Sequence, residues 1–290
     1  MPAETSSPFM NPLLPSTIFH AMDPARIAEL LQPFTEGPRP ARPIREWPGP
    51  SARSESFASE ETARVEESAF VTPALLENIS TYIDMLLRWN ARINLTAVRD
   101  RDEIVTRHFG ESLFAARHLF PDRRVPFPGK ETAGPLGPRS DPRPQEAAFG
   151  PPGLAANDLI DLGSGAGFPG LPIKLWAPAI RVTLIESNQK KATFLREAIR
   201  ALTLTDINVF SGRGENFTGR ARVVTLRAVE RFDSVLRAAA SLVAPSGCLA
   251  LLVGGAQVDR ARQLLPALAW QDPVSVPLSS NRALLLGSKS

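Results

Sequence analysis

The fold class that the sequence predicts is a mostly parallel α/β sheet with helices on both faces, preceded by a separate helical unit. Two observations predict the sheet. From residue 157 onward, short apolar runs alternate with amphipathic helical segments, and a glycine-rich turn follows the first of these runs. A third observation predicts the helical unit, because apolar side chains recur at helical spacing within residues 65–121.

The helical unit, residues 65–121, contains two predicted helices. Thr72 followed by Pro73 is typical of a helix N-cap with proline in the first turn. A second helix is predicted from Asp102. The apolar faces are formed by Leu75, Leu76, Ile79, Tyr82, Ile83, Leu86 and Leu87 in the first helix, and by Ile104, Val105, His108 and Leu113 in the second.

The domain of residues 157–290 supplies the predicted sheet and the helices that cover it. Its expected strands are 159–162, 181–185, 208–211, 223–226 and 249–253, with two further strands near 274–277 and 283–286. Helices are expected at 189–202, 231–243 and 257–268, and one more opens at the glycine-rich turn.

Two proline-rich stretches flank the helical unit and hold most of the 28 prolines of the chain. Residues 1–64 are predicted to be a disordered extension, with a short helix near residues 23–31. Residues 122–156 are predicted to be a flexible insertion, because they mix proline, glycine and charge with little apolar periodicity.

The composition excludes several classes of protein and site. A single cysteine, Cys248, excludes a disulfide framework. No run of about 18 apolar residues predicts a membrane span, and the polar N-terminal stretch lacks the pattern of a secretory signal. We therefore expect a cytoplasmic protein. Three scattered histidines and one cysteine lack ligand spacing, so no metal site is expected.

Positive charge is concentrated in the last segment of the chain. The whole sequence has a net charge of +3, whereas residues 157–290 alone carry 16 Lys and Arg against 10 Asp and Glu. A basic domain favours a polyanionic partner such as RNA, although an ordinary basic protein would have the same balance. Four of these cations lie on one predicted helix, and we interpret them as its solvated face: Lys190, Lys191, Arg196 and Arg200.

The turn after the first predicted strand is the central motif. It reads acidic-x-G-x-G-x-G from Asp161 to Gly167, and it differs from the dinucleotide fingerprint G-x-G-x-x-G. This is the form seen in class I methyltransferases, Rossmann-like enzymes that bind S-adenosylmethionine. Gly163, Gly165 and Gly167 would let the methionine and ribose part of that cofactor approach the backbone. Asp161 would lie near its amino group or the water bound there.

Two further features fit a cofactor site in the same α/β frame. Glu186 ends the second predicted strand, 23 positions after Gly163, where a carboxylate can accept hydrogen bonds from ribose hydroxyls. Gly214 and Glu215 follow the third strand, where adenine would lie. Each feature has a plainer interpretation: a tight turn, an acid that complements a helix dipole, or a solvated surface acid. Their joint occurrence favours the cofactor site, while a nicotinamide enzyme stays open.

Four motifs, in order, resemble one family. Residues 161–170 resemble the signature of the bacterial 16S ribosomal RNA guanine-N7 methyltransferase family, also called glucose-inhibited division protein B. The resemblance covers residues 70–121 and 157–255. The other three motifs are Arg88-Trp89-Asn90 with Ile93-Asn94-Leu95-Thr96, His108-Phe109 with Glu111-Ser112-Leu113, and Leu226-Arg227-Ala228.

The resemblance implies a cofactor, a target and a partner. The cofactor is S-adenosylmethionine, the target is a guanine in the 530 loop region of 16S ribosomal RNA, and the partner is the small ribosomal subunit. We expect a monomer. The residues that the resemblance implies as cofactor contacts are Gly163, Phe168, Gly214, Glu215 and Arg227.

The chain also departs from the family at three places. Glu111 stands where the family usually has aspartate, and Val253-Gly254 stands where it usually has lysine and glycine. Asn281-Arg282 only partly matches a late arginine–histidine pair.

The chemistry of guanine N7 asks little of the enzyme. N7 carries a lone pair and no proton, so alignment rather than a general base is required. Accordingly, no Asn-Pro-Pro-Tyr stretch and no Pro-Cys nucleophile follow the fourth strand. Arg227, at the end of that strand, could bond guanine O6, a phosphate or the cofactor, or else form a surface ion pair. Asn94 and His108 are further catalytic candidates, although a lone histidine near an apolar face is more often structural.

Two other functions remain as alternatives. The loss of a lysine at Val253 motivates a catalytically weakened homologue that binds RNA or the ribosome. A small-molecule methyltransferase is the other, and the short helical unit and the basic domain argue mildly against it.

Overall fold

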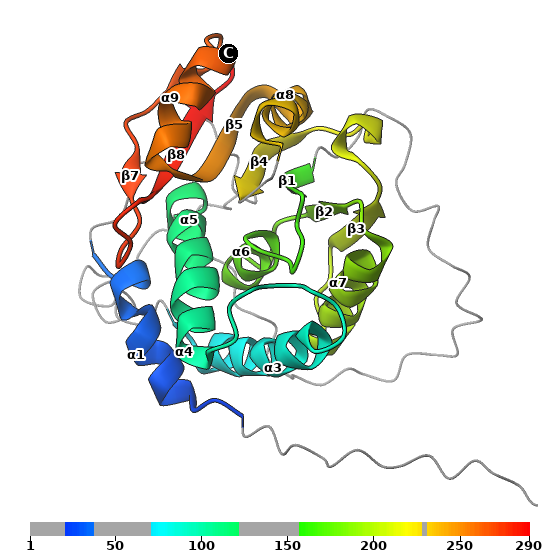
Figure 1. The fold of residues 1–290 in the computed structure, drawn as a ribbon, viewed down its shortest axis with the longest axis vertical. Helices are drawn as coiled ribbons and strands as arrows, with labels where there is room; N and C mark the ends of the chain where they lie inside the picture. The colour runs from blue at the N-terminus through cyan, green and yellow to red at the C-terminus, as the bar shows by residue number, and fades with distance from the viewer. Residues whose placement is uncertain (1–20, 38–70, 122–156, 228–230) are drawn as a thin grey trace, which may run out of the picture.

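The computed structural model describes residues 21–37, 71–121, 157–227 and 231–290. Within them, one sheet has the strand order β3-β2-β1-β4-β5-β8-β6, with β7 paired to β8 (Figure 1). The first five strands pair in parallel, and β8 runs antiparallel to β5. The prediction of a mostly parallel α/β sheet is therefore confirmed. The predicted insertion at 122–156 lies outside the described residues.

The strands and helices follow the sequence pattern closely. Every predicted strand and helix of residues 157–290 is present, and β6 is a two-residue strand that no apolar pattern indicated. The strands are β1 Asn157–Leu162, β2 Val182–Glu186, β3 Ile207–Ser211, β4 Ala221–Arg227, β5 Val243–Gly254, β6 Ala269–Trp270, β7 Val274–Ser275 and β8 Arg282–Ser288. The helices of this part are α6 Gly170–Trp176, α7 Gln189–Ala201, the short η2 Gly214–Asn216, α8 Phe232–Leu242 and α9 Gly255–Leu264.

Alternate residues of the strands build two apolar cores, one on each face of the sheet. Leu159, Val223 and Ala250 face the core formed with α6, α7 and the N-terminal helices. Their neighbours Ile160 and Leu249 face the core formed with α8 and α9. Because side chains of a strand alternate between its faces, near-continuous apolar strands are what a sheet buried on both faces requires.

The helical unit packs on the first of these faces. Its helices are α3 Pro73–Asn90, α4 Arg101–Ile104, the π-helical turn η1 Val105–Gly110 and α5 Glu111–Leu119. Thr72 caps α3 by accepting a hydrogen bond from the Leu75 amide at 3.3 Å, as the Thr-Pro pair predicts. The second predicted helix is thus one continuous helical segment whose middle turn is wound as a π-helix.

One part of the proline-rich extension is a helix, as predicted. The short helix expected near residues 23–31 is α1 Pro24–Thr35, which lies beside α5 (Figure 1). Ile27, Leu31 and Phe34 are fully buried against the helical unit. The overall composition of this stretch does not reveal the packing, because only one face of α1 is apolar and the rest of the stretch is polar. Residues 1–20 and 38–64 lie outside the described residues.

Phe34 of α1 sits directly on the π-helical turn. A Cβ added to Gly110 would lie 2.6–2.9 Å from three carbons of the Phe34 ring, which no real methyl group tolerates. The absence of a side chain at Gly110 therefore lets α1 approach η1.

This contact predicts a coupled pair of substitutions. Gly110→Ala should destabilise the fold by about 1–3 kcal/mol through overpacking, and Phe34→Ala by about 3–5 kcal/mol through a cavity. The double variant should lose at least about 1 kcal/mol less unfolding free energy than the sum of the two single losses, because removing the Phe34 ring leaves room for the added methyl group. Urea unfolding measures all three, with Gly255→Ala as a control because its added Cβ would meet only the tip of Asn281. Simple additivity would contradict the contact.

Candidate active site

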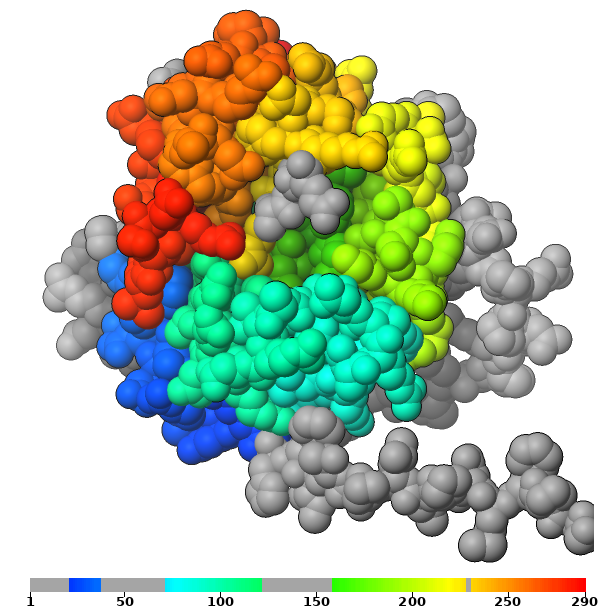
Figure 2. Space-filling model, in the orientation of Figure 1, coloured from blue at the N-terminus to red at the C-terminus, as the bar shows by residue number. Residues whose placement is uncertain are grey.

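A cavity of about 700 Å³ opens at the carboxyl ends of β1, β2 and β4. These ends are level, because Leu162 of β1 pairs with Ile185 of β2 and with Leu226 of β4. Figure 2 shows the hollow between the helical unit and the later strands of the sheet. In an open parallel sheet, the crevice where the strand order reverses is the usual place for a ligand, and here that point lies between β1 and β4.

The glycine-rich turn forms the floor of the cavity. Gly163 and Gly165 both line it, with φ angles of 73° and 56°. A Cβ added to Gly165 would find only the Gly163 carbonyl oxygen within 4 Å, at 3.8 Å, so it would project into open space. The turn is therefore a cradle that leaves the cavity free for a ligand to reach the backbone.

Gly167 has a different role from the one the motif suggested. It does not line the cavity. An added Cβ would overlap the hydroxyl of Tyr82 and the side chain of Leu171, and φ at Gly167 is 87°. This glycine makes room for α3 against the turn, because Tyr82 lies on α3 and donates its hydroxyl proton to the carbonyl of Ala166.

Asp161 lies behind the turn rather than in the cavity. Its carboxylate accepts a hydrogen bond from the Thr225 hydroxyl at 2.8 Å and from the Gly170 amide at 3.2 Å. Burial raises the pKa of Asp161 to about 6, although these donors oppose the shift. The expected contact of Asp161 with the cofactor amino group thus has no counterpart in the cavity lining. The carboxylate instead ties β1 to β4 and to the start of α6.

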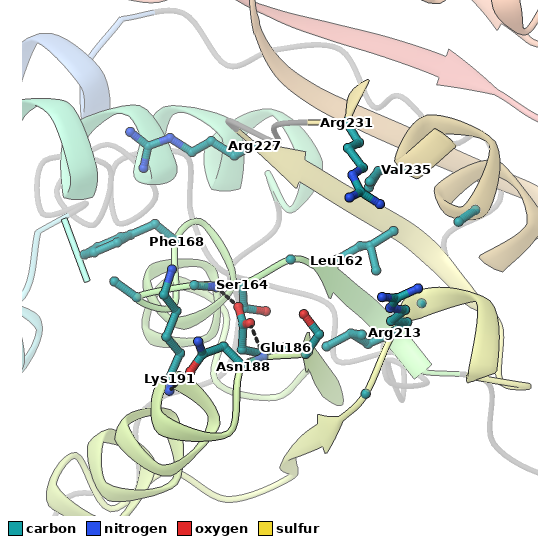
Figure 3. Close-up of a pocket in the computed structure, with 18 of the residues that line it drawn as sticks. Leu162, Ser164, Phe168, Glu186, Asn188, Lys191, Arg213, Arg227, Arg231 and Val235 are labelled. Atoms are coloured by element: carbon teal, nitrogen blue, oxygen red, sulfur yellow. Dashed lines mark hydrogen bonds between the residues drawn. The ribbon is translucent and has the colours of Figure 1, made fainter. Parts of the chain in front are cut away.

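Glu186 combines a structural contact with a free accepting surface. Its two oxygens accept the amides of Gly165 at 2.8 Å and Asn188 at 2.7 Å (Figure 3). A carboxylate can accept about four hydrogen bonds, so each oxygen keeps a lone pair. Because Glu186 also lines the cavity, it holds the turn in place and can still accept hydroxyl protons from a ligand.

Gly214 and Glu215 line the cavity after β3, as expected. Gly214 is buried, and an added Cβ would come within 2.5 Å of Leu162. Glu215 is exposed. This part of the lining follows β3 in the chain and lies against the end of β1 and against α8.

Phe168 lines the cavity, but neither face of its ring is open. Tyr82 stacks on it with centroids 5.5 Å apart and an angle of 11°. His108 stacks on it with centroids 4.8 Å apart and an angle of 27°. Since two rings stacked on a third occupy its two faces, Phe168 can offer a ligand only its edge.

Arg227 reaches from the end of β4 into the helical unit. One terminal nitrogen donates to the Arg107 carbonyl at 2.6 Å and to the Glu111 carboxylate at 3.0 Å, and lies 3.3 Å from His108 Nδ1. Glu111 also accepts from Arg282 of β8 at 3.2 Å. Burial lowers the pKa of Arg227, and the Glu111 charge opposes that shift. Arg227 Nε is buried without a hydrogen-bond partner among the described residues.

His108 is a cavity residue with both ring nitrogens engaged. Nε2 lies 2.7 Å from the Thr96 hydroxyl, and Nδ1 faces Arg227. Burial, followed by the charges of Arg227, Arg107 and Arg282, lowers the pKa of His108 to about 3. The imidazole is therefore neutral near neutral pH. A neutral ring that accepts from Arg227 at Nδ1 must donate from Nε2 to Thr96.

Asn94 is the one catalytic candidate that the structure leaves outside the site. It is exposed and does not line the cavity. Its neighbour Asn90 shapes the same loop instead, since the Asn90 side chain accepts from the amides of Leu95 and Thr96 at 2.9 and 3.0 Å. Asn90 belongs to the Arg-Trp-Asn motif, and its position at the end of α3 was the available signal.

Several cations at the cavity were missed from sequence. Arg213 and Arg231 point toward it from the loops after β3 and before α8, and Lys191 does so from α7 (Figure 3). The solvated-face interpretation of Lys191 is therefore wrong. Among the described residues, five cations and two carboxylates line the cavity: Lys191, Arg213, Arg227, Arg231 and Arg282 against Glu186 and Glu215.

Comparisons with known proteins agree with these features. The family model described as rRNA small subunit methyltransferase G matches residues 75–125 and 152–280. The ribosomal RNA small subunit methyltransferase G of Stenotrophomonas maltophilia (strain K279a) is 34% identical over 219 residues, 73% of this chain and 86% of its own. The protein of the same name from Chloroflexus aggregans is 34% identical over 72% of this chain and 79% of its own.

Likeness to solved structures is weaker. A ribosomal protein L11 methylase from Lactobacillus delbrueckii subsp. bulgaricus aligns with 47% of this chain and 72% of its own, at 13% identity and a TM-score of 0.41. The fold is therefore identified from the strand order and not from this likeness.

The described residues contain neither a candidate membrane span nor a candidate metal cluster. No helix there is long and apolar enough to cross a membrane. No group of three or more His, Cys, Asp or Glu in those ranges is placed to hold a metal ion.

The buried carboxylate predicts a large effect of one neutral substitution. Glu111→Gln should cost about 3–5 kcal/mol of unfolding free energy, because it leaves the buried Arg227 guanidinium and Arg282 without their shared counter-charge. Glu103→Gln is the control, since Glu103 pairs with Arg107 at 2.6 Å with both side chains nearly half exposed, and it should cost only about 0.3–0.5 kcal/mol. Equal losses in urea unfolding would show that the buried pair is not held as described.

The neutral imidazole predicts an acid-sensitive stability. The unfolded chain protonates His108 near its ordinary pKa of 6.5, whereas the fold resists protonation down to about 3. The stability that this group contributes is thus fully present above about pH 6.5. It is lost as the pH falls toward 3, and the loss reaches about 2 kcal/mol at about pH 5. Between about pH 7.5 and 5, wild type should lose that much more unfolding free energy than His108→Gln. Asp161 and His118 titrate in both proteins and so cancel. Parallel pH profiles would contradict the buried neutral state.

Proposed function

The chain belongs to the rRNA small subunit methyltransferase G family, and we propose that it transfers a methyl group from S-adenosylmethionine to N7 of a guanine in the 530 loop region of 16S rRNA. The observation that carries this proposal is the two-part lining of the cavity. A glycine cradle with a carboxylate forms one part, and a basic wall with a neutral histidine forms the other.

The first part fits the cofactor. The open space above Gly165 lets the methionine and ribose atoms approach the backbone, and Glu186 keeps lone pairs for the ribose hydroxyls. The buried loop at Gly214 and the exposed carboxylate of Glu215 bound the adenine end. When bound, S-adenosylmethionine supplies an electrophilic methyl group on its sulfonium.

The second part fits an RNA. Among the residues that the structure describes, five cations and two carboxylates line the cavity, and Arg213 and Arg231 are exposed at it. Neither side chain has an ion-pair partner among the described residues. Arginines placed in this way can neutralise phosphates, which supplies most of the affinity in nucleic-acid binding.

The reacting end of the cavity fits an N7 acceptor. N7 has no proton to remove, and the cavity histidine, His108, is a poor base because its pKa is about 3. Arg227 can donate to guanine O6 and leave N7 free, because O6 lies beside N7 on the same edge of the base. C5 chemistry is disfavoured, because the single cysteine, Cys248, is buried in β5 and burial raises its pKa to about 12.

The loss of a lysine at Val253 does not by itself favour the binding-only alternative. Val253 is buried in β5 and pairs with Ala283, and the next pair is Gly254 with Arg282. Arg282 therefore places a cation close to the position where the family has its lysine, and it also lines the cavity. A monomeric state and a cytoplasmic location stay predictions.

A methyl-transfer assay tests the function. The purified protein is incubated with radiolabelled S-adenosylmethionine and small subunits from cells that lack this methylation. We expect label in 16S rRNA at a guanine N7, mapped by cleavage at the modified base. Cofactor binding without label in RNA would support the binding-only alternative. Label in a metabolite without RNA would support the small-molecule alternative.

The basic wall makes a sharper prediction within the same assay. Arg213→Gln with Arg231→Gln should raise KM for the subunit and lower the salt dependence of binding by a slope of about 1 per lost phosphate contact. The Kd for the cofactor should not change more than about twofold. Arg196→Gln with Arg200→Gln on the exposed side of α7 is the matched control, because it removes the same two charges away from the cavity. An unchanged KM in the double variant would overturn the RNA-facing role of this wall.

A further inference from the structure

The placement of His108 is not explained by cofactor binding or by acid–base chemistry. The side chain lies beside Arg227 and Thr96, whereas Gly214, at the proposed adenine end, lies against Leu162 at the end of β1. Both ring nitrogens already have partners within the protein. Neither nitrogen is left to take a proton from a substrate or to give one.

Three neighbouring side chains nevertheless fix the position of the ring. Thr96 and Arg227 fix its rotation from opposite edges, and Phe168 fixes its tilt from one face. Phe168 is itself held from behind by Tyr82 of α3. The stack therefore runs from α3 through the glycine-rich turn to the π-helical turn, and His108 is its last member.

One surface of this ring is unaccounted for. His108 is only partly buried and lines the cavity, and Phe168 covers one of its two faces. Its edges carry the two bonded nitrogens. The ring surface without a described contact is therefore the opposite face together with the Cδ2 and Cε1 edges, and of these only the face is large enough for a flat group to lie on.

We infer that this open face of His108 is the platform on which the target base stacks while its N7 faces the methyl donor. The inference rests on the proposed function and deepens it. A neutral, flat, rotationally fixed ring is suited to stacking on a base, because every nucleobase offers a flat π-face. Arg227, held beside the ring at 3.3 Å, is placed to donate to the edge of a base lying there.

The charge state of the ring fits this role. Protonated imidazole would add a cation next to Arg227 and Arg282, and burial makes that cation costly. Burial, followed by the charges of Arg227, Arg107 and Arg282, thus keeps the platform uncharged. A general base at this place would need the opposite, a pKa raised toward neutral pH.

Two substitutions separate the ring face from the ring nitrogens. His108→Gln keeps polar atoms near Thr96 and Arg227 but removes the aromatic face. His108→Phe keeps the face and removes the nitrogens. His118→Gln is the matched control, since His118 stacks near Phe114 on α5 and does not line the cavity.

The readout is the stacking of the base itself. The methylation assay maps the target guanine, and 2-aminopurine then replaces it in a 16S rRNA fragment, or in reconstituted subunits if only these are methylated. Fluorescence of the bound probe reports whether the base is stacked. KM and kcat for methyl transfer to unlabelled RNA, the Kd for S-adenosylmethionine and the unfolding temperature are measured in parallel.

The expected pattern is specific. Wild type and His118→Gln should quench the bound probe, while His108→Gln should leave it severalfold brighter and raise KM for RNA by about 5- to 150-fold, the range of one lost base–aromatic stack. His108→Phe should restore the quenching and most of KM. If His108→Phe fails to fold, the contrast between wild type and His108→Gln decides.

Two results would overturn the platform while the proposed function stands. One is wild-type quenching and KM in a folded His108→Gln protein. The other is a folded, cofactor-binding His108→Phe protein as impaired as His108→Gln. A wild type that methylates no RNA would instead overturn the proposed function, and the platform with it.

Discussion

The contact between Arg227 and Glu111 is the interaction on which the geometry of the site depends. It joins the end of β4 to the start of α5 across 116 positions of sequence, and both side chains are almost fully buried. A buried charge is tolerated only when a counter-charge and further hydrogen bonds compensate it. Glu111 serves two arginines, because Arg282 of β8 meets the same oxygen. The helical unit, the parallel sheet and its antiparallel edge are thereby held at one point, next to the cavity.

The π-helical turn carries His108 and is itself bonded to Arg227, so the contact also fixes the position of His108. The amide of Glu111 reaches back five residues to the Thr106 carbonyl, and the carbonyl of Arg107 accepts from Arg227. Single π-turns inside helices often lie at functional sites, because they shift the side chains that follow. Here α1 packs on the same turn through Phe34 and Gly110. An element from the proline-rich extension therefore supports the helical turn that carries His108 at the cavity.

The fold could be predicted from sequence because its signals are local. Apolar runs, helix caps and the glycine turn each depend on a few adjacent residues, and all recur in the structure. Motif position also found Glu186, Gly214 and Arg227 at the cavity. Position in a motif does not say which way a residue faces, however. Asp161 and Gly167 belong to the glycine motif, yet one ties strands together and the other makes room for Tyr82.

What sequence could not supply were contacts between distant segments. Arg213 and Arg231 are unremarkable loop arginines until β3 and α8 bring them to one cavity. Asn94 matched a family motif, but the backbone turn that Asn90 organises leaves it exposed. The role of Glu111 depends on Arg282, 171 positions away.

The arrangement also explains why one cavity can serve two ligands of opposite character. In the proposed function, the cofactor carries a positive sulfonium and would lie over a neutral backbone cradle with Glu186 at its side. The RNA is a polyanion and would meet arginines on the other wall. Between them lie uncharged groups, since Phe168 is apolar and His108 is neutral. A charged histidine there would repel both the sulfonium and the arginines that hold the RNA. Burial and the surrounding arginines lower the pKa of His108, and an uncharged ring at this place is compatible with a cationic methyl donor on one side and a cationic wall on the other.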